Sequence, residues 1–233
     1  MKKAILLCSG GLDSAVTAYY LKNKLKYRKL ILLFFDYGQR TVKQERKSAG
    51  YFARCLNAEF KEIKISEIKN ISNSLINKEG ATARISRRDL KDTKKESDKW
   101  YVPCRNIIFL SYALSLAESL YDQKKEVYDI FVGFKDEGKE GFPDASQSFL
   151  DKFNDVSRIA CKKDFRIIAP LINKDKEDIV LLGKEMKVKL ENTFSCYSGE
   201  GNEKHCGYCL ACKLRQEGFY WANVEDKTKY GQR

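Results

Sequence analysis

The chain has 233 residues, of which 43% are apolar and 33% charged, so it can bury a substantial core and lacks the composition of a disordered protein. No apolar run approaches the roughly 20 residues that a membrane-spanning helix requires, and the N-terminal apolar stretch is too short for a secretory signal. We therefore expect a cytoplasmic protein without a membrane partner; its formal net charge of +12 favours anionic partners, although a lysine-rich composition explains it equally well.

Apolar runs alternate with helical patterns along most of the chain. Strands are predicted at residues 4–8, 30–35, 60–65, 128–134 and 166–169. Helices are predicted at residues 14–25, 41–56, 105–120, 146–160 and 174–188. The helix at 105–120 is apolar on most of its circumference, which indicates a buried helix. The first two strands are almost wholly apolar, as parallel strands covered on both faces are, so we predict a doubly wound α/β fold with a mostly parallel sheet.

Two segments depart from this alternation. Residues 84–99 carry seven basic and four acidic side chains, a mixture typical of a solvated loop; a flap or binding surface is the second interpretation. Near Thr193 the composition shifts to Cys, Gly and Tyr. We therefore divide the chain into a main domain of residues 1–192 and a small C-terminal module of residues 193–233 packed on it.

A glycine-rich turn joins the first predicted strand to the first predicted helix. Ser9, Gly10 and Gly11 form the turn, and Asp13 and Ser14 begin the helix. Backbone N–H groups at a helix start attract anions, and glycines let an anion approach without obstruction by Cβ atoms. The serine hydroxyls add donors, so the turn fits a pyrophosphate. It is neither a Walker A loop nor a Gly-x-Gly-x-x-Gly dinucleotide turn, and an ordinary glycine turn is the alternative.

The sequence Ser-Gly-Gly-Leu-Asp-Ser of this turn resembles the SGGxDS signature of the N-type ATP pyrophosphatases, or PP-loop enzymes. These enzymes cleave ATP between its α- and β-phosphates and adenylate a substrate oxygen. The resemblance implies that the turn holds the leaving pyrophosphate, with Asp13 near Mg²⁺. The implied ATP- and pyrophosphate-binding residues are Cys8, Ser9, Gly10, Gly11, Leu12, Asp13 and Ser14.

Four cysteines lie close together near the C-terminus. They are Cys196, Cys206, Cys209 and Cys212. Two consecutive Cys-x-x-Cys steps and one outlying cysteine fit tetrahedral Zn²⁺, so we expect one structural zinc ion per chain. A cytoplasmic location disfavours disulfides, and an iron–sulfur cluster remains an alternative.

The other cysteines and the single histidine receive simpler interpretations. His205 adjoins the cysteine group and is expected to decorate it without binding the metal, and its isolation argues against Ser-His-Asp and Cys-His catalysis. Cys8, Cys55 and Cys161 are interpreted as small core residues. Packing is also the favoured role of Cys104, with a reactive thiol as the alternative.

Five further segments, together with the turn, resemble the 7-cyano-7-deazaguanine synthase family over nearly the whole chain. They are residues 36–40 (DYGQR), 102–106 (VPCRN), 141–144 (GFPD), 170–171 followed by Lys176-Glu177, and 193–212 with Leu214-Arg215. The resemblance implies an adenine nucleotide alpha hydrolase-like fold and a homodimer. It also implies the partners ATP with Mg²⁺, 7-carboxy-7-deazaguanine and ammonia. The carboxylate would be adenylated and displaced by ammonia to give an amide, and a second adenylation would give the nitrile.

The resemblance also implies roles for individual residues. The implied catalytic residues are Asp13, Ser14, Arg105 and Lys176. The implied substrate-binding residues are Gln39, Arg40, Asp136, Phe142 and Asp144. Cationic Arg105 and Lys176 can offset phosphate charge. Asp144 follows a proline, which places it in a loop where its carboxylate can accept guanine-like N–H groups.

Several positions depart from the family pattern. Thr41 stands where the family usually has histidine, Gly138 replaces an acidic residue within the segment 133–144, Ala145-Ser146 replaces Cys-Arg, and Cys104 replaces glycine. These changes support an alternative: a divergent paralogue that joins a deazaguanine carboxylate to a protein or nucleic-acid amine in antiviral defence. A tRNA-thiolating PP-loop enzyme and a non-catalytic zinc-bearing nucleic-acid module are weaker alternatives. The intact SGGxDS turn argues against the latter.

Overall fold

Five parallel strands form a sheet at the centre of the protein. The computed structural model describes residues 1–138, 141–199 and 203–231. The strands are β1 (Lys3–Leu7), β2 (Lys29–Asp36), β3 (Glu59–Lys64), β4 (Asp129–Val132) and β5 (Ile167–Ile168). They lie in the order β3-β2-β1-β4-β5 with every neighbouring pair parallel. The predicted doubly wound, parallel α/β fold is therefore confirmed, and the direction of winding reverses between β1 and β4.

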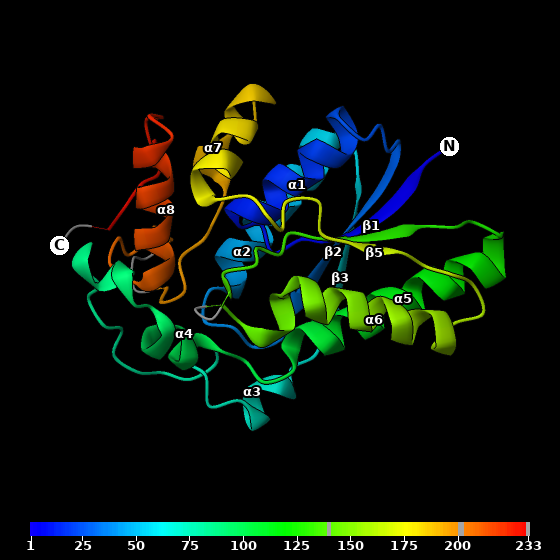
Figure 1. Ribbon diagram of the computed structural model, residues 1–233, viewed down its shortest axis with the longest axis horizontal. Helices are drawn as coiled ribbons and strands as arrows, with labels where there is room; N and C mark the ends of the chain where they lie inside the picture. The colour runs from blue at the N-terminus through cyan, green and yellow to red at the C-terminus, as the bar shows by residue number, and fades with distance from the viewer. Residues whose placement is uncertain (139–140, 200–202, 232–233) are drawn as a thin grey trace.

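Helices cover both faces of this sheet (Figure 1). One layer contains α1 (Leu12–Asn23), α2 (Val42–Leu56) and α7 (Lys176–Glu185), and the other contains α5 (Arg105–Lys124) and α6 (Gln147–Ala160). Successive strand residues face opposite layers, so Leu6 packs with the first layer and Ile5 with the second. Both side chains are fully buried, which explains why the strand sequences are continuously apolar.

Further elements lie outside the predicted set. They are α3 (Ile68–Ile71), α4 (Lys94–Trp100), α8 (Leu210–Trp221), and the 3-10 turns η1 (Arg88–Lys91), η3 (Pro143–Ala145) and η4 (Leu190–Asn192). Helix α8 lies beside α7 (Figure 1), and its Phe219 and the following residue Ala222 belong to the core of the α1 layer. The C-terminal segment is thus packed on the main domain, while a boundary at residue 193 stays a prediction.

The charged segment 84–99 is not simply a solvated loop, because it contains η1 and most of α4. Trp100 ends α4 and is 1% exposed, and its ring packs against Tyr197 with the centroids 5.4 Å apart. Its indole N–H donates to Glu96 Oε1 at 3.1 Å. The ion pairs Lys94–Asp98 and Lys99–Glu96 join successive turns of the helix. Burial of one aromatic side chain therefore orders a segment whose local sequence is strongly polar.

Helix α5 was expected to be buried on most of its circumference, and this expectation is wrong. Its residues Phe109, Leu110 and Ala113 pack on the sheet, whereas Ile107 and Tyr112 are 39% and 42% exposed. The helix lies in the layer that covers one face of the sheet, so only one side of the helix faces the core. Among the described residues, no helix combines the length and apolarity needed to cross a bilayer.

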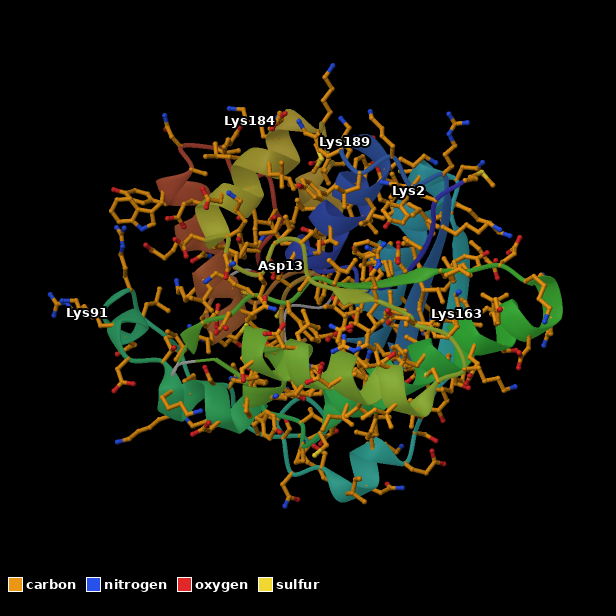
Figure 2. The ribbon with its side chains drawn as sticks, turned by 45° about the vertical axis from the view of Figure 1, so that its right-hand side comes forward. Lys2, Asp13, Lys91, Lys163, Lys184 and Lys189 are labelled. Atoms are coloured by element: carbon orange, nitrogen blue, oxygen red, sulfur yellow. The ribbon has the colours of Figure 1, made fainter. Side chains whose placement is uncertain are left out.

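The lysines labelled in Figure 2 lie at separate places on the periphery of the molecule. Lys2, Lys91, Lys163, Lys184 and Lys189 are all exposed and come from different parts of the chain. These five positive charges therefore do not together form one binding face.

Candidate active site and metal centre

The glycine turn after β1 is held from behind by α2. Gly10 has a φ of +78°, a left-handed conformation that favours glycine. Its carbonyl oxygen accepts hydrogen bonds from Ser48 Oγ (2.7 Å) and Phe194 N (2.9 Å). A Cβ atom on Gly10 would lie 2.7 Å from the backbone oxygen of Glu45, so only glycine fits against α2. The packing thus fixes the turn where α1 begins.

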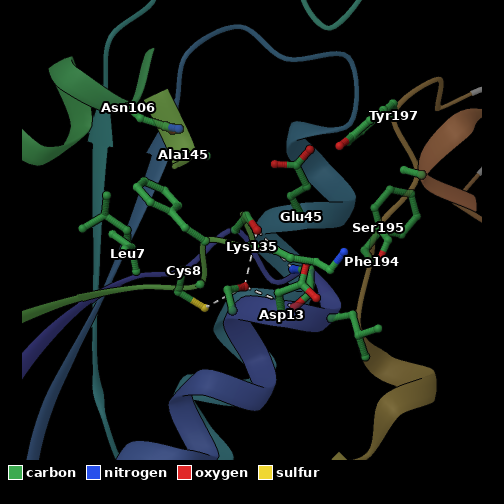
Figure 3. A pocket seen from close by; sticks show the side chains of 18 of the residues that line it. Leu7, Cys8, Asp13, Glu45, Asn106, Lys135, Ala145, Phe194, Ser195 and Tyr197 are labelled. Atoms are coloured by element: carbon green, nitrogen blue, oxygen red, sulfur yellow. Dashed lines mark hydrogen bonds between the residues drawn. The ribbon is translucent and has the colours of Figure 1, made fainter. Parts of the chain in front are cut away.

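A cavity of about 300 Å³ lies in front of this turn, at the carboxyl ends of β1, β2 and β4 (Figure 3). Its lining includes the predicted residues Cys8, Ser9, Gly11, Leu12, Asp13, Ser14, Arg105, Phe142 and Lys176. Gly10 lies behind the turn and outside the lining. The cavity occupies the point where the winding of the sheet reverses, which is where open α/β sheets bind ligands.

The hydroxyl and thiol groups of the turn gather on one side of it. Ser14 Oγ donates to the carbonyl of Gly11 at 3.1 Å and lies 3.4 Å from Ser9 Oγ. Cys8 Sγ lies 3.9 Å from Ser14 Oγ, and burial raises the pKa of the Cys8 thiol, which keeps it neutral. A Cβ atom on Gly133 would lie 2.9 Å from Ser14 N, so the segment after β4 closes tightly over the start of α1.

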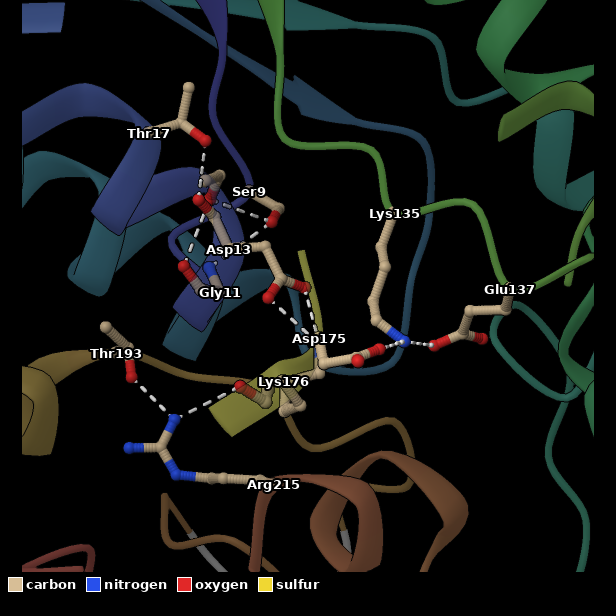
Figure 4. A network of polar contacts seen from close by, with 12 residues as sticks. Ser9, Gly11, Asp13, Thr17, Lys135, Glu137, Asp175, Lys176, Thr193 and Arg215 are labelled. Carbon is tan, nitrogen blue, oxygen red and sulfur yellow. Dashed lines mark hydrogen bonds and ion pairs between the residues drawn. The ribbon is translucent and has the colours of Figure 1, made fainter. Parts of the chain in front are cut away.

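Asp13 and Lys176 form an ion pair at the mouth of the turn (Figure 4). Lys176 Nζ lies 2.9 Å and 2.8 Å from the two carboxylate oxygens of Asp13. Lys176 is the first residue of α7, and the capping box of Asp175 and Asp178 fixes the start of that helix. The Lys176 side chain is 20% exposed and the Asp13 side chain 29%, so the two form a partly shielded ion pair that faces the cavity. On binding a polyphosphate–metal complex, Lys176 can exchange Asp13 for phosphate oxygens, and Asp13 can exchange Lys176 for the metal ion.

Arg105 supplies a second cation to the cavity from the start of α5. Its Nη1 donates to the Tyr37 hydroxyl at 3.3 Å. Burial acts to lower the pKa of Arg105, but the interactions with Tyr37 and Asp144 outweigh it and raise this pKa, so the guanidinium stays charged. Burial raises the pKa of Tyr37 to about 12, so its hydroxyl remains a neutral acceptor. Arg105 therefore presents a fixed positive charge to an anionic ligand.

Four of the five predicted substrate-binding residues do not line the cavity; Phe142 does. Asp144 is buried and its Oδ2 accepts from Asn106 N at 3.1 Å in the first turn of α5. Its carboxylate is therefore not in an open loop as expected. Asp136 accepts from the backbone N–H groups of Gly138 (2.9 Å) and Gln147 (3.0 Å), which lower its pKa.

The other two residues also have contacts outside the cavity. Gln39 is buried and donates to the carbonyl of Phe35 at 2.9 Å. Arg40 Nη1 donates to the carbonyl of Gly80 at 3.4 Å. The binding roles of all four residues stay predictions. Lys139 and Glu140, in the altered segment 133–144, lie outside the described residues.

The cavity also contains residues that were not predicted from the sequence. Tyr37, Glu45, Lys135, Glu137 and Tyr197 all line it. Tyr37 lies inside the DYGQR segment that carried the family resemblance, and Tyr197 directly follows a metal-ligand candidate, so both had a local signal. Glu45 lies one helical turn after Thr41, on the same side of α2, but only the fold places it beside the glycine turn.

Two cysteines do not have the packing role expected of them. Cys55 on α2 is exposed, as is Cys104 directly before α5, whereas Cys8 is buried and Cys161 is half-buried. Cys104 has a φ of +54°, in the left-handed region. The tight turn into α5 requires this conformation, which accounts for the glycine that the family usually has there.

Cys104→Gly is therefore expected to stabilise the protein. A non-glycine residue in the left-handed region costs about 1 kcal/mol, and part of this is offset by the greater freedom of glycine in the unfolded chain. We expect the free energy of unfolding in urea to rise by up to about 1 kcal/mol. A decrease would show that the Cys104 side chain makes stabilising contacts.

The four C-terminal cysteines form a compact group of buried thiols. Cys196, Cys206, Cys209 and Cys212 have sulfur atoms that all lie within 4.8 Å of one another. The separations are 4.0 Å for Cys196–Cys209 and 3.9 Å for Cys206–Cys212. Four sulfurs bound tetrahedrally to Zn²⁺ at about 2.3 Å lie about 3.8 Å apart, so the donor set fits this ion. The amides of Cys206 and Cys209 point at neighbouring sulfurs (3.4 and 3.3 Å), as suits thiolate ligands.

Buried polar side chains fasten the cysteine group to the cavity wall. His205 Nε2 accepts from Ser195 N at 3.0 Å, and burial lowers the pKa of His205 to about 3, so the ring is neutral. His205 therefore lies beside the cysteine group and is not one of its candidate metal ligands, as expected. Arg215 is 1% exposed and donates to Thr193 Oγ1 at 2.6 Å and to Thr228 Oγ1 at 2.8 Å. The segment 194–197 thereby connects the metal-ligand candidates to the cavity.

Comparison with known proteins gives consistent matches over the full chain. The family model described as queuosine biosynthesis protein QueC matches residues 3–223. A 7-cyano-7-deazaguanine synthase of Pyrococcus furiosus is 34% identical, with 98% of this chain and 97% of the relative covered. Proteins of the same name from Methanosphaera stadtmanae and Nitratiruptor sp. are each 37% identical, with 98% of both chains covered.

Proposed function

The chain belongs to the QueC family, and from this premise we propose that it is an ATP-dependent 7-cyano-7-deazaguanine synthase. It converts 7-carboxy-7-deazaguanine and ammonia into 7-cyano-7-deazaguanine and acts in queuosine biosynthesis. Each product molecule requires two ATP, which become two AMP and two pyrophosphates. The protein acts in the cytoplasm as a homodimer.

The observation that carries this proposal is the Asp13–Lys176 pair at the SGGxDS turn, which faces the same cavity as Arg105. The N–H groups at the start of α1 hold the β- and γ-phosphates, and the hydroxyls of Ser9 and Ser14 add donors. Lys176 neutralises charge as pyrophosphate leaves. Asp13 would hold the Mg²⁺ that accompanies ATP. When bound, Mg²⁺ would supply positive charge that lowers the repulsion between the phosphates and the attacking oxygen.

The reaction uses the same cavity twice. A carboxylate oxygen of the substrate attacks the α-phosphorus and expels pyrophosphate, and ammonia then displaces AMP to form the amide. The amide oxygen attacks a second ATP in the same way, and departure of AMP with that oxygen leaves the nitrile. Arg105 stabilises the negative charge that develops on the α-phosphate in both steps.

The remaining residues have binding and supporting roles in this proposal. Phe142 provides an apolar surface for the deazapurine at the cavity wall. Gln39, Arg40, Asp136 and Asp144 bind or position substrate through the loops that they hold. The four cysteines bind one structural zinc ion, which fixes the segment 194–197 along the cavity.

The direct test is to incubate the purified protein with ATP, Mg²⁺, ammonium and 7-carboxy-7-deazaguanine and to follow the deazapurine by mass spectrometry. We expect the amide to appear first and the nitrile to replace it, with two AMP formed per nitrile. An unchanged deazapurine in the presence of bound ATP would contradict the proposal. The divergent paralogue would give that result, but the full-length relatives give it no support.

A further inference from the structure

Glu45 lines the cavity beside the glycine turn and has no role in the steps above. It lies in the first turn of α2, and its backbone oxygen would touch a Cβ atom on Gly10 at 2.7 Å. In Figure 3 its carboxylate points away from α2 into the cavity. The carboxylate therefore lies in the cavity in which, by the proposed function, the adenylated substrate forms.

The hydrogen-bond partners of this carboxylate are neutral. Thr41 Oγ1 donates to Oε1, and Gln39 Nε2 donates to Oε2 at 3.1 Å. Thr41 is the position at which the family usually has histidine, so this chain supplies a hydroxyl donor there. A carboxylate can accept about four hydrogen bonds, which leaves room for further donors from the cavity.

Glu45 also differs from the other acidic residues of the cavity. Asp13 pairs with Lys176 and Glu137 pairs with Lys135, at 2.8 and 3.4 Å. Within residues 1–138, 141–199 and 203–231, the ion pairs do not include Glu45. A shielded carboxylate without an ion-pair partner favours either a proton or a small cation carrying N–H donors.

On the basis of the proposed function, we propose that Glu45 is a catalytic residue that binds the ammonium ion and takes a proton from it. Ammonium has four N–H donors and no lone pair, so it can be held by a carboxylate but cannot attack carbon. Transfer of one proton to Glu45 releases ammonia. The nitrogen lone pair then forms the C–N bond with the adenylated carboxyl carbon, and the C–O bond to AMP breaks. The nitrogen of the new C–N bond loses its extra proton to water, which gives the neutral amide, and the proton held by Glu45 also leaves for solvent.

The surroundings of Glu45 suit a base. Burial raises the pKa of its carboxyl above the ordinary value, which outweighs the opposing hydrogen bonds from Thr41 and Gln39. Among the charged groups that face it, Arg105 lowers this pKa and Asp36 raises it. A raised pKa of the Glu45 carboxyl is closer to the pKa of ammonium, the proton donor, and so favours proton transfer.

The test compares wild type with Glu45→Gln in two reactions: pyrophosphate release on first adenylation, and amide formation from ammonium or hydroxylamine. Hydroxylamine is unprotonated at neutral pH and needs no base to become a nucleophile. We expect Glu45→Gln to adenylate normally, to form amide from ammonium about 100-fold more slowly, and to form hydroxamate at nearly the wild-type rate. Glu45→Asp should recover part of the ammonium reaction.

Several outcomes would overturn the inference. These are an unchanged rate with ammonium, an equal loss with hydroxylamine, or loss of adenylation by Glu45→Gln. The surface variant Glu185→Gln, whose carboxylate pairs with Lys24, serves as the control and should match wild type in every assay. If wild-type protein itself releases no pyrophosphate with 7-carboxy-7-deazaguanine, the proposed function fails, which is a separate result. A thermal melt confirms that Glu45→Gln is folded.

Discussion

Replacing Asp13 with alanine or Lys176 with methionine is expected to reduce pyrophosphate release by about 100- to 1,000-fold. Each variant removes one charge from the pair that spans the glycine turn and the start of α7. In the proposed reaction Lys176 acts on charge that grows as pyrophosphate leaves, so its loss should lower kcat more than it raises the KM for ATP. Asp13→Ala should also raise the Mg²⁺ concentration needed for half-maximal rate.

Lys174→Met is the matched control for the Lys176 variant. Lys174 lies two residues earlier, is exposed, and does not line the cavity. The control removes the same charge from the protein and should leave the rate unchanged. A wild-type rate in Lys176→Met would show that the leaving pyrophosphate is held elsewhere. Urea unfolding of each variant separates this effect from a loss of stability.

The sheet was predictable from sequence because its signals are local. Each strand is covered on both faces, so continuous apolar runs coincide with β1 and β2, and the serine–glycine turn marks the first strand-to-helix junction. Helix α4 was not predictable in this way. Its charged residues indicate solvent exposure, and its order depends on Trp100, which packs against Tyr197 almost a hundred residues later in the chain.

The candidate site likewise contains some residues with a local sequence signal and others that only the fold brings together. The residues of the turn carry their signature within six positions, so their convergence on a cavity could be foreseen. The contacts of Asp144 could not be predicted. A carboxylate after proline is typical of an open loop that can bind a ligand, but in the structure it accepts a hydrogen bond from the backbone N–H of Asn106 in α5. Glu45 gave no signal, because a glutamate in a basic helix normally faces solvent. Only the packing of α2 against Gly10 brings it to the cavity.

Replacing Cys209 with serine is expected to lower zinc content and stability together. A serine hydroxyl does not ionise at neutral pH and is a poor zinc ligand, and the remaining three cysteines would be buried without a cation to offset thiolate charge. We expect zinc to fall from one ion per chain to well below one, and the free energy of unfolding to fall by several kcal/mol. Metal analysis and thermal melts measure both effects on the same sample.

The loss should extend to catalysis, because the cysteine group and the cavity share a segment. Cys196 lies between Ser195 and Tyr197, all three line the cavity, and the amide of the neighbouring Phe194 bonds to Gly10 of the glycine turn. Loss of a metal ion bound to these cysteines would therefore free one wall of the cavity. Cys55→Ser changes an exposed cysteine and should keep both zinc and activity. A stable, metal-free and fully active Cys209→Ser protein would contradict a structural zinc, and iron with visible absorbance in wild type would assign the group to an iron–sulfur cluster.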